Sequence, residues 1–332
     1  MWYSAVEFLV ILALSLLAAP LAAAQPPAKI PRIGVLSPGS PSATSVPMSP
    51  VVQGLRDLGY VEGQHITFAY RSAEGNLDRL PDLAAELVRL PVDMILAGGV
   101  ASALAAKQAT TTIPIVFSEA ADPVGRGLVA SLARPGGNIT GVSYDGGPGI
   151  SGKRLELLKA AVPTISRVAM LVGNVRTPTS DAGEQAQESA ARALGLTLRY
   201  FYVQRREEFT EWVFPAITSD TPTIDALHAA GPLASQYQRQ IADFALQHRL
   251  PTIGIGKNQA EAGSLLSYGP NRRALQQRTA MLVGKILQGA KPADLPVEQP
   301  TQFELVINLK TAKELGLTIP PTVLFQADEV IK

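Results

Sequence analysis

Short apolar runs alternate along the chain with longer segments in which apolar residues recur every three or four positions. The first run, IPRIGVLS, ends at Ser37, and the segment SPVVQGLRDLGY that comes later has proline at its second position and glycine where its apolar spacing stops. Continuous apolar runs are typical of strands buried in a parallel sheet, and the wider spacing is typical of helices. Proline near the start and glycine after the end agree with helix boundaries. The pattern therefore predicts alternating strands and helices.

This alternation occurs twice. It runs through the strand-like segments HITFAYRSA, VDMILAGG and IPIVFSEA, and restarts near residue 150 with RVAMLVGN, LTLRYFYV, IDALHAAG and LPTIGIG. The segments after that, GSLLSYG, one long helix, FELVINL and TAKELG, are too few for a third lobe. A chain of 332 residues is long enough for two. We therefore predict an α/β fold of two doubly wound, Rossmann-like lobes, joined by several crossings that act as a hinge around a crevice.

The order of these segments also sets the expected domain boundaries. We expect a signal peptide at residues 1–24. The N-terminal lobe is expected to comprise residues 29–147 plus about 266–292, and the C-terminal lobe residues 148–265 plus about 293–332.

The first residues carry the pattern of an export signal. An apolar run from Phe8 to Ala19 is followed by Pro20 and by Ala22-x-Ala24, which fits a cleavage site, although the segment before the run carries Glu7 and no basic residue. The run is shorter than the roughly 20 residues of a membrane span. The chain has no cysteine, which excludes disulfides, thiolate metal sites and a lipid-bearing cysteine. We expect an exported periplasmic protein without a lipid anchor.

Charge and motifs exclude several classes of function. The net charge of +1 provides no field that would attract nucleic acid, and no basic run with interleaved aromatic residues occurs. The glycine patterns of dinucleotide and phosphate loops and the nucleophile elbow are missing. His65, His228 and His248 stand in unrelated segments without metal-ligand spacing, and of the three only His228 lies toward a strand end. We expect no cofactor, no metal and no catalysis.

Candidate ligand-binding residues lie where the predicted strands end, because the carboxyl ends of strands in open α/β sheets face the ligand crevice. The turn around Val100, Ala101 and Ser102 is glycine-rich and enters a helix, so its backbone N–H groups are suited to a ligand carboxylate. The complete set of candidates is Ser37, Val100, Ala101, Ser102, Asp122, Ser143, Asn174, Gly231, Pro232 and Lys257. We also weighed a salt bridge from Lys257 across the crevice mouth, against a solvated lysine.

Asp122 is open to two interpretations. It follows an apolar run and precedes Pro123 and a short amphipathic segment, which is the position of a helix N-cap. The same position at a strand end would also let its carboxylate contact a ligand. A lone carboxylate without partner residues is a poor candidate for metal binding or acid catalysis.

Several segments resemble the substrate-binding proteins of ABC transporters, in the branch that includes tryptophan- and tyrosine-type periplasmic binding components. The segments that carry the resemblance include RIGVLSPGSP, DPVGRGLVASLARPGGNITGVS, AGSLLSYG and KPADLPVEQPTQFELVINLKTAKELGLTIPP, and they span the chain from its first strand to its tail. The resemblance implies a type I periplasmic-binding-protein fold that closes on a small solute like a venus flytrap. It also implies delivery of that solute to a membrane permease, and no catalysis.

Some positions depart from the family pattern. Val100-Ala101 stands where the family often has Thr-Pro, and Gly231-Pro232 stands where amino-acid-binding relatives carry a polar pair such as Asp-Asn. Around Gly256 this chain has no aspartate for a ligand amine. These departures weaken the case for an aromatic amino acid as ligand, and a less polar or differently charged solute fits as well. The expected ligand is therefore a small molecule such as an amino acid or an aromatic or organic acid.

The sequence thus predicts a monomeric solute-binding component of an ABC importer. Its expected partners are a small molecule and an inner-membrane permease. A ligand-sensing module for a membrane signalling system and an enzyme on a doubly wound fold are the alternatives.

Overall fold

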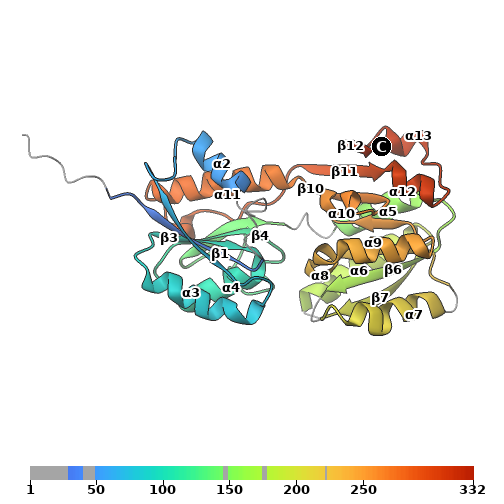
Figure 1. The fold of residues 1–332 in the computed structure, drawn as a ribbon, viewed down its shortest axis with the longest axis horizontal. Helices are drawn as coiled ribbons and strands as arrows, with labels where there is room; N and C mark the ends of the chain where they lie inside the picture. Colours follow the sequence, from blue (N-terminus) through green and yellow to red (C-terminus); the bar gives the residue numbers. More distant parts are fainter. Residues whose placement is uncertain (1–28, 40–48, 145–148, 174–177, 221–222) are drawn as a thin grey trace, which may run out of the picture.

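The computed structural model describes residues 29–39, 49–144, 149–173, 178–220 and 223–332. These residues form two α/β lobes that lie next to each other along the long axis of the molecule (Figure 1). The predicted signal peptide at residues 1–24 lies outside the described residues. In the part of the chain that is described, no helix has the length and apolar character of a membrane span.

The first lobe contains a five-stranded parallel sheet in the order β2-β1-β3-β4-β5. Its central strands are apolar on both faces, so that they require helices on both sides. The strands are β1 (Arg32–Ser37), β2 (Thr67–Ser72), β3 (Met94–Gly98), β4 (Ile115–Ala120) and β5 (Ile139–Ser143).

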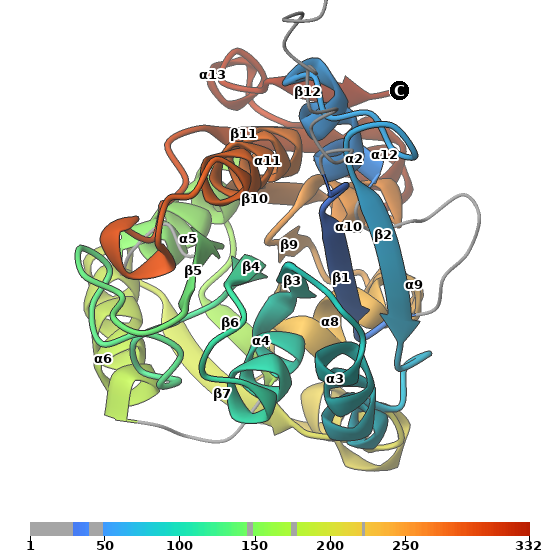
Figure 2. The ribbon, with the colours of Figure 1, turned by 90° about the vertical axis from the view of Figure 1, so that its left-hand side faces the viewer.

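Two pairs of helices cover this sheet, as Figure 2 shows along the long axis. On one face α3 and α4 bury Ile95 and Phe117, and on the other face α2 and α11 bury Ile33 and Leu96. One of these helices, α11, comes from far along the chain, after most of the second lobe. The helices are α2 (Ser49–Asp57), α3 (Leu80–Arg89), preceded by a 3₁₀ turn (Leu77–Arg79), α4 (Gly99–Ala109) and α11 (Arg272–Leu287).

The second lobe contains a seven-stranded sheet in the order β12-β11-β10-β9-β8-β6-β7. Only the pair β10 and β11 is antiparallel, because the chain leaves this lobe after β10 and returns in the opposite direction as β11. The strands are β6 (Arg167–Gly173), β7 (Thr197–Val203), β8 (Ala226–Ala230), β9 (Thr252–Gly254), β10 (Leu266–Pro270), β11 (Phe303–Asn308) and β12 (Glu329–Ile331).

Helices also cover both faces of the second sheet. One core lies under α5 (Gly149–Ala161), α6 (Pro178–Ala193), α12 (Leu309–Glu314) and α13 (Pro321–Leu324). The other lies under a π-helical turn (Phe209–Val213), α7 (Phe214–Ser219), α8 (Pro232–Gln236) and α9 (Gln238–Gln247). The short helix α10 (Lys257–Glu261) packs against β9, β10 and β11. The predicted helix over LASQYQRQIADFALQHR is divided at Tyr237 into α8 and α9, because the backbone leaves the helical region there.

The chain crosses between the lobes three times, and the second and third crossings come later than expected from the sequence. The segment from about 266, expected in the first lobe, forms β10 in the second sheet, because Leu266 is part of that lobe's core. The segment from about 293, expected in the second lobe, stays with the first: Val297 is buried in the first core, and Glu298 pairs with Val142. The crossings therefore follow Tyr144, Pro270 and Glu298.

The end of β4 is irregular. The pairing of β4 with β5 shifts register between Phe117 and Ala120, which marks a β-bulge. Opposite the bulge, a Cβ on residue 141 would overlap the Phe117 carbonyl oxygen, so that this position requires Gly141. The bulge re-aims the chain at the carboxyl end of β4, where Glu119 has a positive φ of 56°.

Candidate functional site

The carboxyl edges of the two sheets meet at the hinge. Tyr144 directly follows β5 of the first lobe, and Ile255 directly follows β9 of the second. The Tyr144 hydroxyl donates a hydrogen bond of 2.9 Å to the Ile255 carbonyl oxygen. Burial raises the pKa of Tyr144 to about 12, so the phenol keeps the proton that it donates at any physiological pH. Strand ends of both lobes are thus brought together here, at the edge where open α/β folds usually bind their ligands.

On the first lobe, the start of α4 offers the clearest anion-binding geometry. Gly98 is its N-cap and supplies no side-chain acceptor, and Gly99 has a φ of 70° that suits glycine. The N–H groups of the first turn, including those of Val100 and Ala101, therefore have no side-chain cap. The Ser102 hydroxyl is fully buried without a hydrogen-bond partner among the described residues. A carboxylate at this helix start would complement both the N–H groups and the helix dipole.

Two serines end strands β1 and β5 at the carboxyl edge of the first sheet, with β3 and β4 between them. Ser37 ends β1, and its hydroxyl accepts from the Gly39 N–H at 3.3 Å. Ser143 ends β5 and is buried, and its N–H donates to the Glu298 carbonyl at 2.8 Å. Ser143 therefore connects the rim to the third crossing. Asn174, the candidate at the end of β6, lies outside the described residues.

Asp122 caps a turn and not a helix. Its Oδ1 accepts from the Gly125 N–H at 3.0 Å, and its carbonyl accepts from the Arg126 N–H at 3.0 Å. The helix expected after it is wrong: the residues from Pro123 onward form successive turns. Asp122 itself has a φ of 46°, which is a left-handed conformation. The N-cap residue of an α-helix typically has an extended backbone instead.

On the second lobe, the candidates are backbone positions and a paired lysine. Gly231 has a φ of 92° and precedes Pro232, the first residue of α8. Lys257 begins α10, and its Nζ lies 2.6 Å from Glu329 of β12, in the same lobe. This hydrogen bond with Glu329 raises the pKa of Lys257. Lys257 therefore forms its ion pair with Glu329 of its own lobe, and not across the crevice mouth as considered from the sequence.

Comparison with known proteins identifies the family. The model described as "ABC transporter substrate binding protein" matches residues 32–331. The chain belongs to this family. It is 28% identical over 271 residues to the tyrosine-binding protein of Clostridioides difficile strain R20291, covering 80% of this chain and 75% of that protein. The predicted solute-binding role is confirmed at the level of the family.

Solved structures agree with this fold. A conserved domain protein from Vibrio cholerae O1 biovar El Tor has a TM-score of 0.82 and 26% identity, covering 91% of this chain and 100% of that chain. An ABC domain from Streptococcus pneumoniae in complex with L-Trp has a TM-score of 0.80 and 27% identity, with the same coverage. The predicted two-lobed α/β fold of a periplasmic binding protein is confirmed.

Sequence reasoning missed the polar residues at the hinge of this substrate-binding protein. Glu119 and Arg272 form an ion pair of 2.7 Å that joins β4 to the start of α11. Tyr144 joins the lobes directly. Neither pattern nor spacing marks them, because their partners are distant in sequence. A second contact was missed for the same reason. The Arg206 guanidinium, which follows β7, lies 5.3 Å from the centre of the Tyr237 ring, which follows β8.

His228, which the sequence places toward a strand end, is a core residue of this substrate-binding protein. His228 is buried in β8, and neither ring nitrogen has a hydrogen-bond partner among the described residues. Burial, and then the nearby Arg154 charge, lower the pKa of His228 to about 3, so the ring is neutral. No group of three His, Asp or Glu residues within the described ranges is arranged to hold a metal ion.

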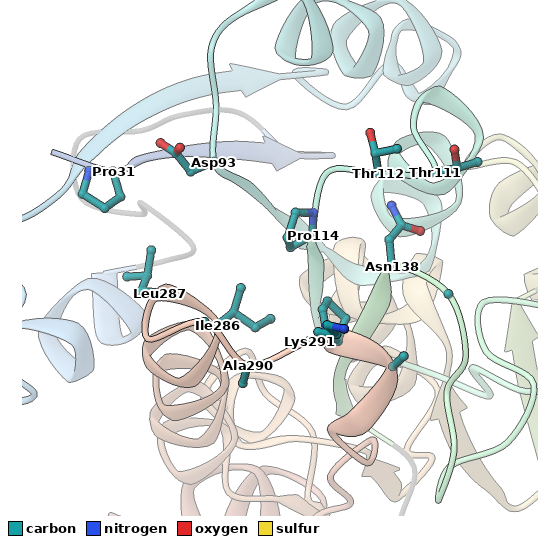
Figure 3. A pocket seen from close by; sticks show the side chains of 14 residues that line it. Pro31, Asp93, Thr111, Thr112, Pro114, Asn138, Ile286, Leu287, Ala290 and Lys291 are labelled. Carbon is teal, nitrogen blue, oxygen red and sulfur yellow. The ribbon is translucent and has the colours of Figure 1, made fainter. Parts of the chain in front are cut away.

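A hollow of about 540 Å³ lies at the opposite edge of the first lobe (Figure 3). It is lined by Pro31, Asp93, Pro114 and Asn138, which precede strands β1, β3, β4 and β5, so it lies away from the crevice. The Asp93 carboxylate already accepts from Lys29 and from the Arg32 N–H, and the Asn138 amide donates to the Thr110 and Ile113 carbonyls. These polar groups serve the fold, and the crevice remains the candidate site.

Asp122→Ala is expected to lower the free energy of unfolding by about 1–2 kcal/mol. The change removes the acceptor for the Gly125 N–H and leaves alanine in the left-handed region, where it has no local hydrogen bond to compensate. Asp122→Asn keeps an acceptor oxygen and tolerates this backbone conformation, so it should remain within about 0.5 kcal/mol of the wild type. Urea unfolding followed by circular dichroism measures both. An alanine variant as stable as the wild type would contradict the capping role.

Proposed function

We propose that this chain is the exported, monomeric receptor of an ABC importer, which captures a small carboxylate between its lobes and delivers it to a membrane permease. Export rests on the signal pattern of residues 1–24, and the missing cysteine leaves no site for a lipid anchor. Binding and lobe closure are the whole of the proposed activity, and no chemical step is included.

The observation that carries this proposal is the start of α4 at the rim of the crevice. Its first-turn N–H groups have no side-chain cap, and Gly98 and Gly99 allow a ligand to approach the backbone closely. Because the two carboxyl edges meet at Tyr144 and Ile255, a carboxylate at this helix start would face the second lobe. Closure would then shield the ligand from water, and the closed form would be the state that a permease distinguishes.

We infer an aromatic side chain on the ligand from two relatives of the family. One is a tyrosine-binding protein, and the other was crystallised with L-Trp. In this chain Tyr237 stands at the end of α8, the short helix that begins after Gly231, and the Arg206 guanidinium lies over its ring. At the same rim, Gly231 and Pro232 offer no acidic side chain to a ligand amine. These features favour recognition of a carboxylate and a ring over recognition of an α-amino group.

A thermal-shift assay with matched pairs of ligands tests this function. L-tryptophan and L-tyrosine are each compared with the desamino acid that lacks only the α-amino group. A ligand at about 100 times its Kd stabilises the folded protein by about 2.7 kcal/mol, because it binds the folded state alone. We expect stabilisation by at least one pair, with the desamino acid binding as tightly as the amino acid or more tightly.

The matched pairs also define the contrary results. If the amino acids stabilise and the desamino acids do not, an amine site exists and the inferred selectivity is wrong. If neither pair changes the melting temperature, the proposal of an aromatic carboxylate as ligand is wrong. Asp82→Asn, on the exposed surface of α3, is the matched control for a rim variant such as Asp122→Asn, since only the rim variant should change affinity.

A further inference from the structure

The Tyr144 hydroxyl reaches from the first lobe to the main chain of the second lobe. Tyr144 directly follows β5, and Ile255 directly follows β9, so the two residues belong to different sheets. The hydroxyl donates to the Ile255 carbonyl oxygen at 2.9 Å, across a separation of 111 residues in the sequence. This hydrogen bond spans the lobes, and its geometry therefore depends on how the lobes lie relative to each other.

The donor is fixed to the first lobe. The Tyr144 ring packs against the first-lobe core that contains Val142 of β5 and Leu275 of α11. Its backbone N–H donates to the carbonyl of Ala120, the last residue of β4, at 3.1 Å. Because a packed core yields little to small forces, the hydroxyl moves with the first lobe as a whole.

The acceptor is fixed to the second lobe in the same way. The Gln259 side chain is buried; its Oε1 accepts from the Ile255 N–H, and its Nε2 donates to the Ala229 carbonyl of β8 at 3.3 Å. The next residue is Gly256, where a Cβ would lie 3.1 Å from the Tyr144 hydroxyl oxygen, so the glycine leaves room for the hydroxyl. The Ile255 peptide group is therefore held by its own lobe and is open to a donor from the other.

A hydrogen bond between two rigid bodies holds only over a narrow range of positions. An O–H···O bond is formed up to about 3.0 Å between the oxygens, so a relative displacement of about 1 Å breaks it. Tyr144 is the one donor to the Ile255 carbonyl found among the described residues. Without the hydroxyl, this carbonyl would lack a donor at the present lobe angle, whereas water reaches it when the lobes move apart.

We propose that Tyr144 is a positioning residue that holds the two lobes at one angle in the ligand-free protein. The bond favours the angle at which its hydroxyl meets the Ile255 carbonyl over all angles at which the two groups separate. Tyr144 thereby sets how often the crevice takes this angle before a ligand arrives, and the apparent affinity for a ligand depends on that population. The inference goes beyond the proposed carboxylate ligand, and its test needs no ligand.

The test measures the distance between the lobes in the ligand-free protein. The chain contains no cysteine, so Asp82→Cys and Glu207→Cys give two specific spin-label sites. Both residues are exposed; Asp82 lies in the first turn of α3 in the first lobe, and Glu207 follows β7 in the second. Because α3 and β7 lie on the side away from the connection of β10 to α11 (Figure 1), rotation at the crossings changes this distance. Pulsed electron resonance gives its distribution.

We expect the doubly labelled protein with Tyr144 intact to show its main peak at the distance that the structure gives for the two sites. Tyr144→Phe keeps the ring and removes the hydroxyl, so it should lower the population at this distance, relative to all others, by about five- to tenfold. Tyr60→Phe is the matched control. The Tyr60 hydroxyl also donates to a main-chain carbonyl, that of Gly284 at 3.4 Å, but both residues belong to the first lobe, so this variant should leave the distribution unchanged.

Two results would overturn the inference. One is a Tyr144→Phe distribution that matches that of the Tyr60→Phe control, even if the melting temperature falls, because the bond would then add stability without setting the lobe angle. The other is a distribution without a peak at the distance of the structure while Tyr144 is intact, because the bond would then not hold the lobes. Failure of every aromatic acid to bind would reject the proposed ligand and would leave both distributions as they are.

Discussion

Gly269→Ala is expected to be the most destabilising small substitution in this protein, with a loss of about 3 kcal/mol or more in the free energy of unfolding. A Cβ at this position in β10 would overlap the Ile255 carbonyl oxygen, and the obstacle is backbone, which cannot rotate away. The displaced carbonyl is the acceptor of the Tyr144 hydroxyl at the hinge. Urea unfolding followed by circular dichroism measures the loss.

Gly183→Ala is the control for this prediction. Gly183 lies in α6, and a Cβ there meets no atom within 4 Å. Because alanine restricts the unfolded chain and favours helix, this variant should gain up to about 1 kcal/mol. Opposite signs at the two glycines would show that the close approach of Ile255 causes the loss. A Gly269→Ala variant with wild-type stability would mean that β10 and the hinge can separate without cost.

A loss of stability at acid pH is expected from His228, by about 4 kcal/mol between pH 6.5 and pH 3. The unfolded chain binds a proton at this histidine below its ordinary pKa of 6.5, whereas the folded protein does so only near its lowered pKa of about 3. Unfolding therefore becomes more favourable as the pH falls through this range. Burial is the main cause, and the Arg154 charge adds to it.

His228→Leu separates this effect from the titration of carboxylates. The substitution removes a buried ring whose nitrogens have no partner among the described residues, so at neutral pH it should cost little or should stabilise. Below pH 6.5 its free energy of unfolding should fall less steeply than that of the wild type. His248→Gln, at an exposed position, is the control. Parallel pH curves for His228→Leu and the wild type would contradict a buried neutral histidine.

Much of the candidate site was predictable from strand ends alone. Ser37, Ser143 and Gly231 stand at or just after the carboxyl ends of β1, β5 and β8, as apolar runs and turn residues had indicated. The interactions of these residues were not predictable. Lys257 illustrates the limit, because Glu329, which holds it, is 72 residues away in the sequence and belongs to the last strand.

The sequence by itself determined the alternation of strands and helices, the division into two lobes, the family and the absence of thiol chemistry. These follow from local apolar spacing, from turn residues and from composition, all of which act within a few residues. Tertiary structure decided which sheet receives β10, that residues up to Glu298 stay with the first lobe, and that Glu119 and Asp122 take a left-handed backbone. Those choices depend on hydrogen-bond and ion-pair partners from the other crossings, and such partners are near only after the chain has folded.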